Sequence, residues 1–238
     1  MRKLEQAHLQ VIVSKLGPHQ QRDLAKTLRH FAGFCISAGL IDRDPTAGLR
    51  LAKRKKSDGW RTWSEDDIAK FEAVHPVGST ARLALHVMLY TGLRRADAVR
   101  LGPPHVRGGV VRITPQKTAH STAFELEVPV HPVLGATIAA TPTTGLSNFI
   151  IGRGGKPLKA ETFGSYMRRW CDEAGLPEVS AHGLRKAVCR RLIEAEAPPH
   201  MIMALTGHTD VKQLEPYTRT FDRARLARRA VDLMIGRR

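Results

Sequence analysis

The sequence lacks the features that would place it outside the cell or in a membrane. Its three cysteines, Cys35, Cys171 and Cys189, are scattered and form no C-x-x-C pair, so neither a disulfide framework nor a redox motif is expected. No apolar run approaches the length of a bilayer span, and the first residues have no signal-peptide core or cleavage site. We therefore expect a soluble, cytoplasmic protein with structural thiols.

Metal-binding and nucleotide-binding motifs are also missing. The eleven histidines include no H-E-x-x-H pair and no metal-ligand spacing with cysteine. The stretch GRGGK at 152–156 has glycines and a lysine, but Pro157 follows Lys156, so the spacing of a phosphate-binding loop is not met. We interpret this stretch as a turn and expect neither a metal nor another cofactor.

Positive charge is what the sequence has in excess. Lys and Arg total 38 against 22 Asp and Glu, which gives a formal net charge of +16. This balance favours a polyanionic partner, and nucleic acid comes first because each phosphate neutralised releases counterions. An anionic membrane is a weaker alternative, since no long basic amphipathic helix with bulky apolar anchors is evident. A well-solvated basic surface without such a partner is the remaining alternative.

Periodicity predicts a small helical region, a linker and a larger domain. Apolar residues recur at helical spacing from 19 to 39, where Gly39 is placed to end a helix. The segment 51–61 is dense in positive charge and ends in Ser, Asp and Gly before a new helix start. The expected organisation is a helical region at 1–50, a basic linker at 51–61 and a second domain at 62–238.

The second domain is predicted to be mainly α-helical with a small antiparallel β-sheet. Ser64 and Asp67 have the spacing of a reciprocal helix cap, and the apolar helix after them breaks at Gly92. Residues 109–130 change to an alternating period, which predicts a β-hairpin with Lys117 in or beside its connection. One further strand would complete a small sheet, and helical patterns then return up to the C-terminus.

Several polar residues are candidates for one site, although each is weakly diagnostic alone. His182 and Arg185 stand at i and i+3 of a predicted helix and therefore share a face. Arg94 follows the glycine break, with Asp97 three residues on to brace it, and His208 follows a glycine at a helix end. The alternatives are surface decoration, a solvated ion pair of little energetic value, and a simple capping group.

The order of these motifs is more specific than any one of them. The chain reads TGLR, a lysine-bearing hairpin, HGLRKA, TGH and then Tyr217, nine residues after His208. This ordered set is similar to that of the tyrosine recombinases of the phage integrase family. Segments such as GKPLKAETFGSYMRRWCDEAGLP and YTRTFDRARLA resemble bacterial integrases beyond those positions, and the resemblance runs from about residue 20 to the C-terminus.

The resemblance implies a set of site residues. The implied catalytic residues are Arg94, Lys117, His182, Arg185, His208 and Tyr217, supported by Asp97 and Gly207. The implied DNA-binding residues are Lys53, Arg54, Lys55, Lys56, Arg95 and Lys186.

The implied reaction cuts and rejoins DNA by transesterification. The tyrosine hydroxyl attacks the scissile phosphodiester, a 3′-phosphotyrosyl bond forms and a 5′-hydroxyl leaves, so no ATP or metal is required. Two arginines suit the transition state because guanidinium is a permanently charged, bidentate donor. Lys117 would be the general acid, His182 would take or share the tyrosine's proton, and His208 would hydrogen-bond the phosphate.

The resemblance also implies fold, partners and location. The expected fold is the tyrosine-recombinase catalytic domain at 62–238, preceded by a partial helical core-binding (SAM-like) domain at 1–50. The implied partner is double-stranded DNA, bound by a tetramer of this chain with accessory DNA-bending proteins and without a membrane, in the bacterial cytoplasm at the nucleoid. The tail ARLARRAVDLMIGRR would dock on a neighbouring copy or pack on its own domain.

Two alternatives to an active recombinase or integrase remain open. Only about fifty residues precede the linker, and Pro216 restricts the backbone directly before Tyr217, so the chain could be a truncated or catalytically silent DNA-binding remnant. A type IB-like topoisomerase or resolvase would use a similar residue set. A covalent protein–DNA adduct would argue against the remnant, and relaxation of supercoiled DNA without a second site would favour the topoisomerase.

Overall fold

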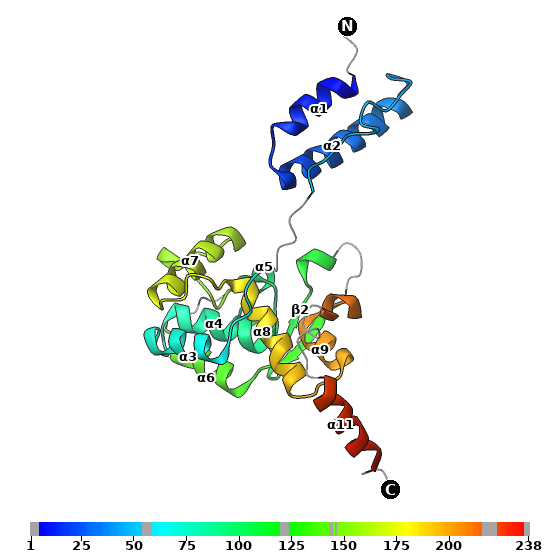
Figure 1. Ribbon diagram of the computed structural model, residues 1–238. Coiled ribbons are helices and arrows are strands. Elements are labelled where there is room, and N and C mark those ends of the chain that lie inside the picture. Colours follow the sequence, from blue (N-terminus) through cyan, green and yellow to red (C-terminus); the bar gives the residue numbers. More distant parts are fainter. Residues whose placement is uncertain are drawn as a thin grey trace. The chain divides into compact units, whose positions relative to one another are not determined.

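The computed structural model describes residues 5–53, 59–119, 124–142, 145, 147–215 and 223–235. The chain divides into two compact units, Met1–Asp58 and Gly59–Arg238 (Figure 1). The division falls inside the segment 51–61 that the sequence marks as a basic linker. No helix in these ranges is long and apolar enough to cross a membrane.

In its described residues the first unit is built from the helices α1 (Gln6–Ser14) and α2 (Pro18–Ser37). Helix α2 matches the prediction, and Gly39 after its end has a φ of 67°, a conformation that glycine adopts without strain. Helix α1 was not predicted, because its buried stripe consists of Leu9 and Val13 alone. The chain after α2 returns along α1, where the Gln10 side chain bonds both the N–H and the carbonyl of Arg50.

The second unit begins with α3 (Glu65–Val74), α4 (Thr80–Thr91) and α5 (Arg95–Ala98). Ser64 and Asp67 form the reciprocal cap that the sequence predicts, with hydrogen bonds of 3.1 and 2.7 Å. Helix α4 is buried along most of its length, and Gly92 ends it at a φ of 61°. The predicted break therefore lies where expected.

A three-stranded antiparallel sheet follows, with the strands in sequence order β1 (Val106–Arg107), β2 (Val110–Ile113) and β3 (Leu126–Pro129). The predicted hairpin is β2 with β3, and the predicted third strand is β1. Val111 pairs with Val128, and Ile113 with Leu126, so one face of the hairpin carries buried apolar side chains. Lys117 lies in the connection between the two strands, on the short helical turn η2 (Gln116–Thr118).

The rest of the unit is helical. It contains α6 (Pro132–Ala140), α7 (Ala160–Glu173), α8 (Ala181–Glu194), α9 (Pro199–Thr206) and α11 (Arg223–Ile235), with the short turns η1 (Pro103–His105), η3 (Arg153–Gly155) and η4 (Val211–Leu214). Helix α6 was not predicted, since its sequence PVLGATIAA has no clear polar face. The GRGGK stretch is a turn, as predicted, and Ile151 pairs with Pro157 across it.

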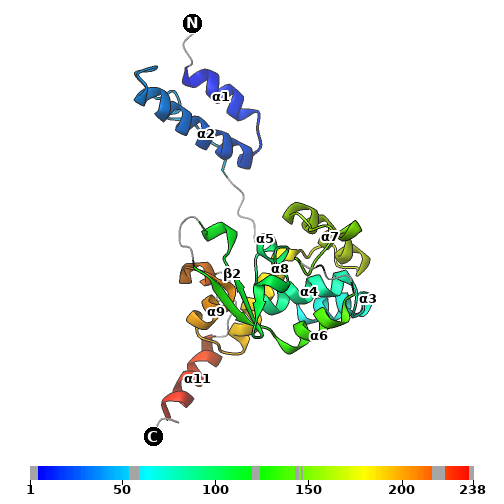
Figure 2. The same ribbon diagram turned by 180° about the vertical axis from the view of Figure 1, so that it is seen from behind.

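Helix α8 lies in the middle of the second unit, between α4 on one side and α9 on the other (Figures 1 and 2). Its first turn packs tightly on the chain that enters the unit: a Cβ on Gly183 would lie 2.2 Å from the carbonyl oxygen of Arg61. The indole N–H of Trp63 also donates to the carbonyl of Ser180, at 2.9 Å. These contacts fix the helix that carries His182 and Arg185.

All three cysteines are free and buried. Burial raises the pKa of the Cys171 thiol to about 12 and that of Cys189 to about 11. Because the thiolate is the reactive form, these two side chains are chemically quiet at neutral pH. The structure thus agrees with the prediction of structural thiols.

Candidate active site

Arg185 is a buried guanidinium at the junction of three helices. It projects from α8, is 4% exposed, and its Nη1 donates to the carbonyl oxygens of Gly92 and Thr206 at 2.5 and 2.6 Å. Gly92 caps the C-terminus of α4, and Thr206 is the last residue of α9. The final carbonyls of a helix lack partners within it and carry the negative end of its dipole. Two helix ends therefore compensate one buried positive charge.

Glycines allow the two helix ends to converge on Arg185. Gly92 and Gly207 each end a helix with a left-handed backbone, at φ values of 61° and 67°. A Cβ on Gly92 would lie 3.1 Å from Cγ2 of Thr206, so the two ends are in close contact. The bend at Gly207 then turns His208 back towards Arg185. Gly207, expected as a supporting residue, thus has a direct geometric role.

His208 contacts Arg185 directly. The side chain is 8% exposed, and its Nε2 lies 2.9 Å from Nη2 of Arg185. Its Nδ1 lies 2.6 Å from the Thr206 hydroxyl. Burial lowers the pKa of His208 to about 3, helped by the positive charges of Arg185 and Arg94. Both ring nitrogens thus have protein partners. The hydrogen bond from His208 to a phosphate stays a prediction.

His182 lies one turn before Arg185 on the same helix, at the surface of the unit. The burial of part of its ring lowers its pKa, and the charges of Lys186, Arg185, Arg94 and Arg95 lower it further. His182 and Arg94 both also act on the pKa of His208. Arg94, His182, Arg185 and His208, which are up to 114 positions apart, therefore share one electrostatic environment.

Asp97 does not brace Arg94 in the way that the sequence suggested. Among the described residues its carboxylate, 1% exposed, pairs with Arg100 at 3.4 Å and accepts the backbone N–H of Gln116 at 2.9 Å. The prediction assumed a local i,i+3 contact with the preceding arginine, but the carboxylate of Asp97 bonds Arg100 and the first residue of η2 instead. Asp97 thereby ties the turn that carries Lys117 to helix α5, next to Arg94.

The remaining predicted residues are more dispersed. Lys117 is exposed on its turn. Arg95 is exposed on α5 with its guanidinium against Gly164 of α7, and Lys186 donates to the carbonyl of Trp60 at 2.6 Å. Lys53 is exposed at the end of the first unit. Tyr217, Arg54, Lys55 and Lys56 lie outside the described residues, as does Pro216.

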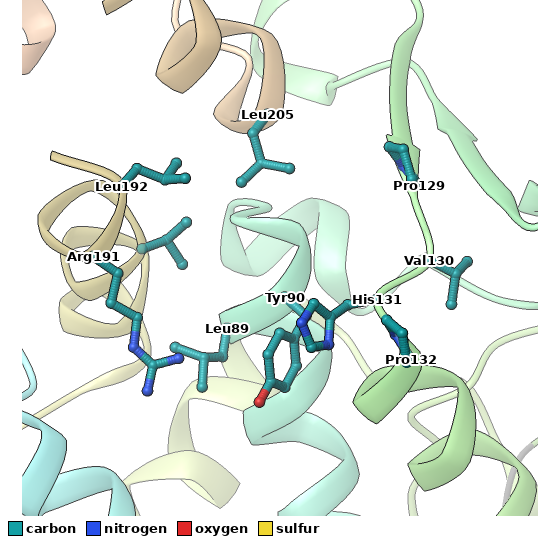
Figure 3. A pocket seen from close by; sticks show the side chains of 10 residues that line it. Leu89, Tyr90, Pro129, Val130, His131, Pro132, Arg191, Leu192 and Leu205 are labelled. Atoms are coloured by element: carbon teal, nitrogen blue, oxygen red, sulfur yellow. The ribbon is translucent and has the colours of Figure 1, made fainter. Parts of the chain in front are cut away.

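A pocket of about 510 Å³ lies elsewhere in the second unit (Figure 3). It is formed by residues of α4, β3, α6, α8 and α9, and the ring of His131 stacks on Tyr90 at 4.2 Å between centroids. Its wall is mostly apolar, and none of the described catalytic candidates lines it. The convergent charged groups and this pocket are therefore different places in the unit.

Sequence reasoning missed Thr206 and the backbone carbonyl of Gly92. The signal for Thr206 was present, because a threonine in the last turn of a helix can bond the carbonyl four residues back and remain fixed there. The role of the Gly92 carbonyl had no signal, since it depends on a contact between residues 93 positions apart.

The sequence of this chain is similar to those of known tyrosine recombinases. The model of the phage integrase family matches residues 65–223. Tyrosine recombinase XerD of Xanthomonas campestris pv. campestris is 28% identical over 223 residues, covering 86% of this chain and 69% of that protein. XerD of Pseudomonas aeruginosa is 27% identical over 213 residues, with coverages of 84% and 70%.

Solved structures of similar fold include two integrases. A lambda integrase dimer bound to a COC′ core site superposes with a TM-score of 0.77 at 19% identity, covering 94% of this chain and 82% of that one. The Tn1549 transposon integrase in complex with circular intermediate DNA gives 0.72 at 14% identity, with coverages of 97% and 86%. The mainly helical fold with a small antiparallel sheet is thus that of known integrase structures.

Proposed function

The chain belongs to the phage integrase family and is a tyrosine recombinase, and we propose that it cleaves and rejoins DNA at specific sites through a 3′-phosphotyrosyl intermediate on Tyr217. The observation that carries this proposal is the cradle of Arg185. A buried guanidinium held by two helix ends and His208 is a rigid, permanently charged donor. Such preorganised donors suit a transition state in which charge gathers on phosphate oxygens.

Arg94 and Arg185 would stabilise the pentacoordinate phosphorus while the Tyr217 oxygen attacks. Tyrosine is almost fully protonated at neutral pH, so a base must accept its proton. The lowered pKa of His182 keeps its imidazole neutral at pH 7, which is the form that can accept a proton. We assign this step to His182.

Lys117 would protonate the leaving 5′-oxygen. Its position supports this role, because the turn is exposed and is anchored next to Arg94 through the bond from Gln116 to Asp97. The second step reverses the first: the 5′-hydroxyl of another strand attacks the phosphotyrosine, Lys117 takes back a proton, and Tyr217 is released.

Double-stranded DNA is the partner we propose, in agreement with the net charge of +16. Arg95, Lys186 and Lys53 are candidates for phosphate contacts, as are the linker residues Arg54, Lys55 and Lys56. The first unit would act as a partial core-binding domain, the linker would lie on the DNA, and the second unit would be the catalytic domain. A cytoplasmic location at the nucleoid is part of this proposal.

An assembly on DNA follows from the same proposal. Lambda integrase has been solved as a dimer on a core site and as a tetramer on a Holliday junction. Among the α11 side chains that the structure describes, Val231, Met234 and Ile235 are 53%, 77% and 67% exposed. This exposure favours docking of the tail on a neighbouring copy over packing on its own domain.

Covalent capture tests the proposal. The protein is mixed with DNA fragments spanning its own gene, denatured in SDS, and examined for DNA that stays attached to protein. We expect an adduct that disappears in Tyr217→Phe and persists in the control Tyr166→Phe, a tyrosine on α7. Salt-sensitive binding with no adduct would instead support a silent DNA-binding remnant.

A further inference from the structure

Three buried groups form a hydrogen-bonded chain whose proton positions follow from geometry. The Thr206 hydroxyl lies 2.6 Å from the carbonyl oxygen of Ile202 and 2.6 Å from Nδ1 of His208. His208 Nε2 lies 2.9 Å from Nη2 of Arg185. Thr206 is 1% exposed and His208 8% exposed, so protein groups, and not bulk water, set their bonds.

The direction of each bond can be assigned. A carbonyl oxygen has no proton, so the single hydroxyl proton of Thr206 must point to Ile202. The oxygen of Thr206 is then an acceptor towards His208, and the proton in that contact belongs to Nδ1. Because Arg185 is always protonated, its Nη2–H donates and Nε2 of His208 must offer a lone pair. His208 is therefore neutral and protonated at Nδ1.

We propose that Thr206 is a positioning residue that fixes the tautomer of His208, so that a neutral imidazole acceptor orients Arg185 for phosphate binding. The inference rests on the proposed function of the site, and Thr206 itself acts only through its neighbours. Without the hydroxyl, the bond from Nδ1–H to Thr206 is lost and the imidazole can rotate or change tautomer. An Nε2–H facing Arg185 would then place two donors against each other.

The low pKa of His208 agrees with this arrangement, since a neutral ring adds no third positive charge beside Arg185 and Arg94. Within the described residues, Nη1 of Arg185 bonds two carbonyls and Nη2 contacts one imidazole. A planar guanidinium held at both terminal nitrogens has a fixed orientation, which is the property that bidentate phosphate binding requires.

The first test reads the tautomer without DNA. The full chain is labelled with ¹⁵N-histidine, and long-range ¹H–¹⁵N spectra are recorded at neutral pH, with His208 assigned by its loss in His208→Asn. We expect His208 to be protonated at Nδ1 and bare at Nε2. Thr206→Val should lose the dominance of this form, and Thr206→Ser should keep it. If His208 of the wild-type chain is protonated at Nε2, the proposal is wrong. This outcome does not depend on whether the variants fold.

The second test separates positioning from folding. Valine keeps the methyl group that lies against Gly92 but removes the hydroxyl, whereas serine keeps the hydroxyl. With DNA binding unchanged, the single-turnover cleavage constant of Thr206→Val should fall roughly fivefold, the effect of one lost net hydrogen bond, and Thr206→Ser should restore it.

A matched control is available in the same unit. The Thr137 hydroxyl also donates to a carbonyl, that of Val133, and also contacts a histidine Nδ1, that of His86, at 2.6 Å. Thr137→Val should leave the cleavage constant unchanged. Equal losses in both valine variants would overturn the proposal, because the effect would then be one of general stability. If the wild-type chain forms no adduct, the proposed recombinase function is contradicted. The ¹⁵N spectra still show which nitrogen of His208 is protonated.

Discussion

The second unit contains two histidines held in the same way at Nδ1 and in opposite ways at Nε2. Both His86 and His208 meet a threonine hydroxyl at 2.6 Å, and both hydroxyls donate to the carbonyl four residues back. At Nε2, however, His208 faces the Arg185 guanidinium at 2.9 Å, and His86 faces the Glu72 carboxylate at 2.8 Å. The contact between His86 and Glu72 requires a proton between Nε2 and the carboxylate oxygen. The contact between His208 and Arg185 requires that Nε2 of His208 carries no proton.

In both clusters the threonine fixes the proton on Nδ1, and the group opposite Nε2 decides whether that nitrogen must accept a hydrogen bond. Burial lowers the pKa of both rings. At His208 the neighbouring arginines lower the pKa further. At His86 the Glu72 carboxylate opposes the effect of burial on the pKa, and Arg82 and His131 lower it by smaller amounts. The His208 cluster thus orients the guanidinium of Arg185 in the candidate active site. The His86 cluster joins α3, α4 and α6.

The largest loss of cleavage is expected when the guanidinium of Arg185 is replaced. Arg185→Lys removes the planar fork that bonds two carbonyls and His208 at once, so cleavage should fall on the order of a hundredfold or more. Arg190→Lys, on the same helix but in a surface ion pair with Glu65, should stay close to the wild-type rate. The measurement is single-turnover formation of the covalent adduct. A rate for Arg185→Lys that stays close to that of the wild type would contradict the role of the cradle.

Acid should destabilise the fold through His208. Its pKa is about 3 in the folded chain against an ordinary value of 6.5, so between these pH values the unfolded chain binds more protons. The free energy of unfolding is therefore expected to fall as pH drops from about 6.5 towards 3, by up to roughly 1.4 kcal/mol per pH unit from this group. Urea unfolding of wild type and His208→Asn across this range checks it. Parallel curves for the two chains would show that His208 does not contribute.

Glu72→Gln should make the His86 cluster resemble that of His208. The amide can donate to Nε2, as Arg185 does at His208, so the proton between ring and carboxylate should be lost while Nδ1 stays protonated. The free energy of unfolding should fall by about 1 kcal/mol, because a charge-assisted bond is replaced by a neutral one. Histidine ¹⁵N spectra and urea unfolding test this, and an unchanged titration of His86 would be evidence against a shared proton.

The smallest effect is expected from Thr137→Val. Loss of one buried hydroxyl contact to His86 should cost about 1 kcal/mol of the free energy of unfolding. Adduct formation by the folded fraction should not change, since the His86 contacts lie on α3, α4 and α6. A loss of cleavage as large as that of Thr206→Val would mean that general stability, and not the contact to His208, sets the rate.

Much of the local structure could be predicted from the sequence because its causes are local. The Ser64–Asp67 cap and the helix ends at Gly92 and Gly207 follow from residues within one turn of each other. The hairpin that carries Lys117 follows from its alternating period. Helices α1 and α6 could not be predicted in this way, because their apolar residues form no regular stripe and tertiary packing stabilises them.

The family and the identity of the candidate residues can be read from the chain without its fold, because the order TGLR, Lys117, HGLRKA, TGH and Tyr217 is a pattern along the sequence. The hydrogen-bond partners of those residues depend on tertiary packing. It placed the carbonyls of Gly92 and Thr206 on Arg185, turned Asp97 to Gln116, and made His208 an acceptor. The physical reason is that a buried charge must find its partners in space, and these partners lie 19 to 93 positions away along the chain.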